Sequence, residues 1–350
     1  MVHKPLTLAA LALLAAACSS PASPGPAPPR LMPPSARPGA LVLQAVPDTL
    51  LLAPLLTPRG ELHQLQFYLN LRNDGGTPLA LQRLELTTLR RGQALEHQVV
   101  EQPRLARELR GAPWMVMRDR QTLAAAHRWR DALTHPRKDT VLKAGESVSL
   151  ARRFALFLDS EDLPDQLRVK VTAQATSAEL LIPVEAYRQR TPLGLPIKGR
   201  WWVLAGHRFD ETHGQAFVLS QSFAYDLGIL GPDLSTFDLT ANPQLSASYR
   251  AHGQPILAAA DGVVAMLNDG VADNNPVGRR PSWRELLARP HDLAGNFVVL
   301  DHGQGEYSAY MHLQPGLTVK VGQRLAAGEE LGRCGNSGNS SEPHLHFQLQ

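Results

Sequence analysis

Two histidines close to the C-terminal end of the 350-residue sequence are spaced to act at a single site. His344 and His346 follow Pro343 in a run that reads as a β-strand. Alternation along a strand places both imidazoles on one face, about 6.5–7 Å apart along the backbone, with Leu345 and Phe347 on the core face. Such a pair can serve one cation-centred site, with one histidine as ligand and the other as a base beside it. The alternative interpretation is a pair of solvent-facing histidines on a sheet.

Histidine is concentrated in the C-terminal half of the sequence. Eight of the 13 histidines lie there, namely His207, His213, His252, His291, His302, His312, His344 and His346. Histidine is the commonest metal ligand and general base in proteins. The distribution therefore indicates that any chemistry belongs to this half of the chain, with His252, His291 and His302 interpreted as surface or turn residues.

Four motifs around these histidines occur in a recognisable order. Residues 295–348 contain GNFVVLDHG, EYSAYMHL, VKVGQRLAAGEELG and GNSGNSSEPHLHF, in that sequence. This closely resembles the catalytic core of the LytM/lysostaphin-type zinc endopeptidases, which cut the peptide cross-links of bacterial peptidoglycan. The resemblance implies an antiparallel, all-β domain of the lysostaphin-like, duplicated hybrid-motif type. It does not extend to residues 41–190.

The resemblance also implies a set of ligands for one Zn²⁺ ion per chain. In that family, zinc is held by a His and an Asp of a first motif and by the second His of the His-x-His pair, which here is His346. The best match to the first motif is His213 and Asp226, separated by twelve residues, whereas three are common in the family. His207 is the competing ligand. Asp226 lies in an apolar strand, where an unpaired carboxylate would be costly and a cation would account for it.

His344 and His312 are the catalytic residues that the resemblance implies. Two neutral imidazoles and one carboxylate leave zinc an open fourth position, as in catalytic zinc sites. Zinc lowers the pKa of bound water from about 15.7 to about 7. His344 or His312 would take its proton, and both can hydrogen-bond the oxyanion of the tetrahedral intermediate. The sequence has no HExxH helix, so the base is not the glutamate of that class.

The first residues of the chain resemble a bacterial lipoprotein signal. Lys4 precedes an apolar run over 6–17. The run finishes in small residues that lead directly to Cys18. We therefore expect 1–18 to be a signal peptide with Cys18 lipidated, and the alternative is plain secretion with cleavage after Ala17. Ser19 follows the cysteine, and in lipoproteins a residue other than aspartate at this position is typical of sorting to the outer membrane. Both interpretations place the protein in the cell envelope, in the periplasm or attached to the membrane through Cys18.

The rest of the sequence divides into a linker and two β-rich regions. Residues 19–40 are rich in proline and predict a semi-extended tether. Residues 41–192 show period-2 alternation that predicts an immunoglobulin-like β-sandwich, and residues 193–350 form the expected peptidase domain. Expected strands of the first region are Gln64–Arg72, Ala80–Leu89, Ser147–Leu158, Gln166–Thr172 and Ala178–Glu185, with Arg104–Arg130 irregular or partly helical.

The expected peptidase domain is also predicted to be β-rich. Its strand signals are Pro255–Met266, Asn296–Asp301, Tyr307–Leu313 and His344–Leu349, and the one weak helical pattern is Ser282–Ala288. Gly335–Ser341 lacks the lysine and spacing of a phosphate-binding loop, so we interpret it as a tight connection that aims the next strand. The insertion Asn268–Leu293 is expected to form a loop at the edge of the substrate groove.

Composition excludes several classes of function. A formal net charge of +3 gives no support for nucleic-acid binding. The two cysteines, Cys18 and Cys334, exclude a disulfide scaffold and a cysteine-based zinc ribbon. If Cys18 carries lipid, Cys334 is a lone thiol, for which a buried structural role is expected.

The favoured hypothesis is a zinc-dependent endopeptidase that hydrolyses peptidoglycan cross-links through a zinc-activated water. The alternative, from a different class, is a non-catalytic envelope protein of the same fold that binds murein or activates another cell-wall hydrolase. A third hypothesis, an adhesive or carbohydrate-binding β-protein, leaves the ordered His and Asp residues unexplained. The family often continues beyond the position of Gln350, so a C-terminally truncated chain is a further expectation. The sequence leaves open which peptidoglycan bond is cleaved. It also leaves open whether the N-terminal domain covers the substrate groove and inhibits the enzyme or docks the enzyme onto a partner.

Overall fold

A computed structural model of the chain describes residues 41–57, 60–109, 139–156, 163–174, 176–206, 221, 223–282, 285 and 289–350. The expected signal peptide, the proline-rich tether, His207 and His213 lie outside these residues. Most of Arg104–Arg130 and of Ser282–Ala288 also lies outside them, although a short helix α1 (Arg104–Glu108) is present. Within the described ranges, no helix is long and apolar enough to cross a membrane.

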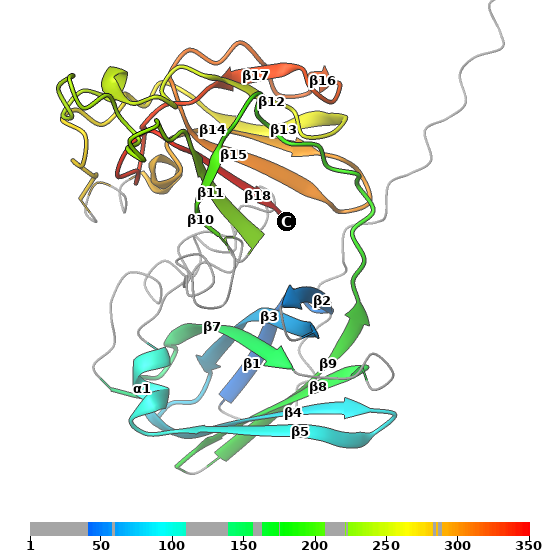
Figure 1. Cartoon of the computed structure of the whole chain (residues 1–350). Coiled ribbons are helices and arrows are strands. Elements are labelled where there is room, and N and C mark those ends of the chain that lie inside the picture. The colour runs from blue at the N-terminus through cyan, green and yellow to red at the C-terminus, as the bar shows by residue number, and fades with distance from the viewer. Residues whose placement is uncertain are drawn as a thin grey trace, which may run out of the picture. The chain divides into compact units, whose positions relative to one another are not determined.

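The N-terminal region is a nine-stranded, mainly antiparallel assembly (Figure 1). Its strands are β1 (Leu41–Val46), β2 (Leu50–Thr57), β3 (Gly60–Asn73), β4 (Leu79–Arg90), β5 (Gln93–Glu101), β6 (Val141–Leu142), β7 (Ser147–Leu156), β8 (Gln166–Ala173) and β9 (Thr176–Ala186). The main path runs β1-β3-β2-β9-β8-β4-β5, with β6 on β4 and β7 on β3. The expected strands in this region are therefore confirmed over the described residues.

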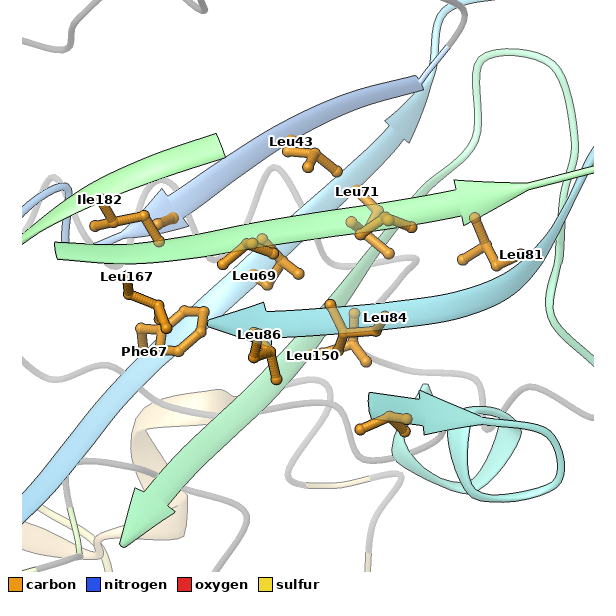
Figure 2. Close-up of a cluster of buried hydrophobic side chains, with 14 of the residues drawn as sticks. Leu43, Phe67, Leu69, Leu71, Leu81, Leu84, Leu86, Leu150, Leu167 and Ile182 are labelled. Carbon is orange, nitrogen blue, oxygen red and sulfur yellow. The ribbon is translucent and has the colours of Figure 1, made fainter. Parts of the chain in front are cut away.

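Period-2 alternation builds the core of this region, as the sequence predicts. Alternate residues of β3, among them Phe67, Leu69 and Leu71, are at most 1% exposed. Figure 2 shows them with Leu84 and Leu86 of β4 in one apolar cluster. β2 and β9 pair in parallel and so join the strands on either side of them in one nine-stranded sheet. An immunoglobulin-like arrangement of two separate sheets is thus not confirmed.

A seven-stranded sheet dominates the C-terminal region, in the order β10-β11-β18-β15-β14-β13-β16 (Figure 1). Its strands are β10 (Trp202–Ala205), β11 (Ala224–Gly228), β13 (Gly262–Asn268), β14 (Asn296–Asp301), β15 (Tyr307–Leu313), β16 (Arg324–Leu325) and β18 (Leu345–Leu349). All their pairings are antiparallel, and β18 is bonded to β11 on one side and to β15 on the other. The strand that carries the His-x-His pair is consequently held from both sides.

One expected strand is wrong in this region. Pro255–Met266 is divided into β12 (Pro255–Leu257) and β13, because the chain turns at residues 258–261. β12 leaves the main sheet and pairs with β17 (Glu330–Arg333) in a separate ribbon. Short 3-10 turns, η2 (Ser246–Ser248) and η3 (Pro290–Leu293), complete the described elements here.

The glycine-rich segment Gly335–Ser341 is the tight connection that the sequence predicts. Gly338 has a φ of +75°, and a Cβ there would lie 2.3 Å from the backbone nitrogen of Gly295. A Cβ on Gly295 would in turn lie 2.3 Å from the Ser337 hydroxyl oxygen. Only glycine permits this approach of two backbones, which packs the connection against the start of β14.

Glu306, in the turn between β14 and β15, anchors the segment that follows β9. Its carboxylate accepts hydrogen bonds from the Tyr187 hydroxyl (2.8 Å) and from the backbone amides of Arg190 and Thr191 (both 2.7 Å), and a further one from the Thr191 hydroxyl. Burial of the carboxylate acts to raise its pKa, but these hydrogen bonds outweigh burial and lower the pKa below the ordinary 4.5. Glu306 is 2% exposed.

Replacing Glu306 by glutamine is expected to lower the free energy of unfolding by about 2 kcal/mol at pH 7, since charge-assisted hydrogen bonds are lost and an amide faces N–H donors. The folded-state pKa lies below the unfolded one, so the carboxylate's contribution is complete above about pH 4.5 and disappears as the pH falls through the folded pKa. Denaturant unfolding of both proteins between pH 3 and 7, with the exposed Glu330→Gln as control, measures this. A stability difference independent of pH would contradict it.

Candidate metal centre

The register of β11 and β18 brings Asp226 and His346 together. The two residues are paired across these strands, and directly opposite side chains on one face of an antiparallel pair are in contact. The Nδ1 atom of His346 lies 2.9 Å from the Asp226 Oδ1 atom. Leu345 and Phe347 are buried in the apolar core, as alternation along the strand predicts. His346 itself is 2% exposed, so the imidazole and the carboxylate meet out of bulk water.

His344 approaches the same carboxylate from the residue that precedes β18. Its Nε2 atom lies 3.4 Å from Asp226 Oδ1, and its Nδ1 atom lies 2.7 Å from the backbone carbonyl of Glu342. Burial disfavours the charged form of His344, but the hydrogen bond and charge of Asp226 outweigh it, so the pKa is raised. The solvent-facing alternative for the histidine pair is wrong, because His344 is also buried.

A bulge in β15 directs His312 to the same place. The pairing of β14 and β15 shifts register between Asn296 and Val298, and His312 takes a φ of +62°. This left-handed backbone is unfavourable for a non-glycine residue and is common where a site requires it. The Nδ1 atom of His312 lies 2.8 Å from the carbonyl of Ser337, which fixes the ring.

The ring of His312 completes a group of three imidazoles around one carboxylate. Its centroid lies 5.0 Å from that of His344 and 5.9 Å from that of His346. Burial and the positive charges that His344 and His346 can carry lower its pKa well below the ordinary 6.5. His312 is consequently neutral near pH 7, with the proton on Nδ1 and the lone pair on Nε2.

Four of the five predicted site residues therefore converge, namely Asp226, His312, His344 and His346. The fifth, His213, and its competitor His207 lie outside the described residues. Over the described part of the chain, no three His, Cys, Asp or Glu side chains form a group arranged to hold a metal ion by themselves. The third ligand that the sequence predicts therefore stays a prediction.

Comparison with protein families decides the nature of this region. Residues 246–350 match the sequence model of Peptidase family M23. The C-terminal part of this chain is a peptidase family M23 domain. The match includes His312, His344 and His346, whereas Asp226 lies upstream of it on β11. The resemblance deduced from the motifs is confirmed.

Several relatives of the M23 domain are named for peptidoglycan or murein. The Vibrio cholerae peptidoglycan DD-endopeptidase ShyA is 34% identical over 97 residues, which are 28% of this chain and 17% of ShyA. The Escherichia coli murein hydrolase activator EnvC is 30% identical over 122 residues, 35% of this chain and 25% of EnvC. Among solved structures, a zinc containing peptidase from Vibrio cholerae has 13% identity and a TM-score of 0.28 over 85% of this chain and 80% of that one. The chain thus spans a quarter or less of these two curated relatives.

The hydrogen bonds around His346 test whether the residues of the M23 domain fit a zinc ion. Gln348 donates its amide to Gln350 Oε1 (2.8 Å), so its own Oε1 atom faces His346 Nε2 (3.0 Å) and accepts the proton there. A neutral His346 then turns the lone pair of Nδ1 toward the Asp226 carboxylate. Two acceptors repel at this distance unless a proton or a metal cation joins them. Asp226 Oδ1 and His346 Nδ1 are thus two donor atoms of the kinds that zinc binds, directed at one position.

Gln348 is a functional residue that the sequence analysis did not identify. It continues the period-2 row of His344 and His346, and this spacing alone could have indicated it. It is fully buried. Histidine ligands commonly donate their second N–H to an oxygen acceptor that fixes the ring and its tautomer, and Gln348 has the position for this role.

Replacing Gln348 by leucine is expected to weaken zinc binding by about 10- to 100-fold, because His346 loses the acceptor that fixes its tautomer. Glutamate at the same position keeps an acceptor and serves as the matched control, with affinity close to that of the original protein. Competition with a fluorescent zinc chelator measures both, alongside Tm. A folded leucine variant with undiminished zinc affinity would show that Gln348 does not position His346.

The remaining histidines with described side chains have structural partners. His302 bridges the Asp261 carbonyl and the Ser308 hydroxyl, each at 2.7 Å, and His252 bonds Asp273 at 2.7 Å. Cys334 is fully buried, and burial raises the pKa of its thiol, so it is an inert core residue as predicted.

Proposed function

We propose that this chain is a zinc-dependent endopeptidase that hydrolyses peptide cross-links of bacterial peptidoglycan. The observation that carries the proposal is the cluster of Asp226 with the buried His346, His344 and His312, the three histidines lying within the M23 domain. A carboxylate and an imidazole in contact, with two further imidazoles nearby, are the side chains that metal-assisted hydrolysis requires.

Asp226 and His346 would hold the zinc ion, with His213 as the third ligand and His207 as its competitor. When bound, zinc supplies a Lewis acid that lowers the pKa of water and polarises a peptide carbonyl. Gln348 keeps the Nδ1 lone pair of His346 available on the side of Asp226. A ligand set of two imidazoles and one carboxylate leaves room for substrate at the metal.

His312 and His344 would carry out the proton transfers. Each ring is held by its Nδ1 atom at a backbone carbonyl, that of Ser337 for His312 and that of Glu342 for His344. Both therefore present Nε2 to the site. An imidazole in this tautomer accepts a proton from the attacking water at Nε2 and, once protonated, donates a hydrogen bond to the oxyanion or the proton to the leaving amine.

A second candidate function is a non-catalytic activator of another murein hydrolase. The similarity to EnvC, which is named as such an activator, is the observation that favours it. Asp226 and the three histidines argue for hydrolysis instead, because an activator has no use for a carboxylate shared by two buried imidazoles. The outcome of cleavage experiments separates the two functions.

We further propose that the protein works in the periplasm, anchored to the outer membrane through a lipidated Cys18, with peptidoglycan as its partner. The support is the signal-like run that ends at Cys18 and the peptidoglycan-directed names of the relatives. Metabolic labelling with an alkyne fatty acid, compared with Cys18→Ser, tests the anchor. Label on the serine variant would contradict it.

Digestion of purified peptidoglycan tests the function itself. Protein comprising residues 19–350 is incubated with peptidoglycan as prepared, after treatment with a chelator, and after zinc is returned. Mass spectrometry of the released fragments identifies the bond cut. The proposal requires cross-linked fragments to be lost with zinc and preserved with chelator, whereas unchanged cross-linking in every sample would favour the activator.

A further inference from the structure

The insertion between β13 and β14, together with Gly338, lines an open cavity of about 220 Å³. Three arginines and three acids contribute to its lining, namely Arg279, Arg280, Arg289, Asp273, Glu285 and Asp292. The volume is several times the roughly 30 Å³ that a water molecule occupies in the liquid. It is large enough for a carboxyl group and the carbons that bear it.

The acids of this cavity are already bound within the protein. Asp273 accepts from the Asn336 amide and contacts His252, both at 2.7 Å. The Glu285 carboxylate accepts hydrogen bonds from the Ser282 amide and the Ser282 hydroxyl, both at 2.7 Å. Asp292 forms an ion pair with Arg289 at 3.0 Å. The three carboxylates are thus held in place, Asp273 and Glu285 by hydrogen bonds and Asp292 by an ion pair.

Arg279 and Arg280 are not fixed in this way. Both are exposed, and none of the ion pairs among the described residues includes either of them. The turn that carries them is fixed by bonds from the Arg279 amide to the Pro276 carbonyl (3.1 Å) and from the Val277 amide to the Gln244 carbonyl (2.8 Å). The Ser282 hydrogen bonds lower the pKa of Glu285, and Arg279 helps to lower it only through the electrostatic field, so the cavity holds two guanidinium groups that no ion pair of the described residues fixes in place.

The same loop forms one wall of the cavity and fixes the catalytic candidates. Gly338 lines the cavity, and the Asn274 side chain holds the carbonyls of Gly338 (2.8 Å) and Ser340 (3.1 Å). Ser337, the residue before Gly338, supplies the carbonyl that orients His312. The loop that lines the cavity therefore also sets the orientation of His312.

We propose that this cavity binds a carboxylate of the peptide substrate through Arg279 and Arg280. The inference rests on the proposed function and specifies its substrate, namely stem peptides with a free carboxylate near the bond that is cut. Arginine presents a planar fork of donors that matches both oxygens of a carboxylate. Amidated stem peptides of equal size lack the charge and would be bound more weakly.

The test compares Arg279→Gln/Arg280→Gln with the original protein on two cross-linked muropeptides, one with free carboxylates and one in which they are amidated. Dissociation constants are measured by calorimetry on chelator-treated protein, and kcat and KM after zinc is returned. We expect Kd and KM for the free-carboxylate peptide to rise about tenfold or more in the double variant. The amidated peptide should bind both proteins equally weakly. Arg324→Gln, which removes an exposed arginine outside the cavity, is the control.

Binding and cleavage together separate the two levels of the proposal. An arginine-dependent preference for the free carboxylate in binding, without any cleavage, supports the carboxylate site and rejects the hydrolase. Cleavage by the original protein with no change in Kd or KM in the double variant rejects the carboxylate site and leaves the hydrolase intact. Equal affinity of the original protein for both peptides also rejects the site. Tm values of all variants verify folding.

Discussion

Replacing His346 by alanine is expected to remove zinc from the protein and to lower the rate of peptidoglycan cleavage by more than about a thousandfold, since several kcal/mol of transition-state stabilisation depend on the metal. The reason lies in the β11–β18 register. His346 is the imidazole whose lone pair faces Asp226, at 2.9 Å. Zinc content by plasma mass spectrometry and cleavage by chromatography of the digest measure the two losses.

The matched control for His346→Ala is His302→Ala, a histidine at the end of β14 with structural bonds only. It should lower Tm but keep zinc and cleavage. A folded His346→Ala protein that retains one zinc per chain would contradict the ligand assignment. Cleavage that survives without zinc would contradict the mechanism as well.

Replacing His312 by alanine is expected to separate the metal from the chemistry. The ring is held at Ser337 and its Nδ1 atom is directed away from Asp226, so zinc should stay bound with near-unchanged affinity. The rate should fall about 10²- to 10⁴-fold, the usual contribution of a general acid–base group. Cleavage kinetics and zinc titration on the same preparation provide the measurement.

Two outcomes would revise the role of His312. Loss of zinc together with rate would make it a ligand, and loss of neither would make it a structural residue of the bulge. Ser337→Ala is a useful companion, because it keeps the backbone carbonyl that orients the ring and should retain most of the rate. Its hydroxyl bonds only the Asn296 amide and the Leu313 carbonyl.

The His-x-His pair shows what the sequence alone can predict. Alternation along a strand and the proline before it were sufficient to place Leu345 and Phe347 in the core and both histidines on the opposite face. Asp226 was expected from the resemblance to the family's first motif, and the cost of an unpaired carboxylate in an apolar strand supported that expectation. The placement of Leu345, Phe347 and the two histidines succeeds because it depends on one local period.

His312 shows where such reasoning ends. Regular alternation cannot predict its orientation, because a bulge in β15 and a φ of +62° direct the ring to the site. Those features depend on β14 and on the loop that carries Ser337, which is distant in sequence. The motif order, and not the pattern of β15 itself, identified this residue.

The fold was predicted unevenly for similar reasons. β3, β4 and β8 alternate clearly and were expected, whereas β5 is mostly polar, with Val100 as its one fully buried residue, and was not. The division of Pro255–Met266 results from pairing of β12 with the distant β17. The anchoring of Tyr187 and Thr191 by Glu306 joins residues more than a hundred positions apart, and no local signal reveals it.

The most direct test of the zinc mechanism follows bound metal and cleavage in one sample. Protein stripped with a chelator is titrated with zinc, and at each step bound zinc and the rate of cleavage of a cross-linked muropeptide are measured. The mechanism predicts that the rate rises in proportion to bound zinc and saturates at one ion per chain. A fully zinc-loaded protein that cuts no cross-link, or a rate indifferent to bound zinc, would contradict it.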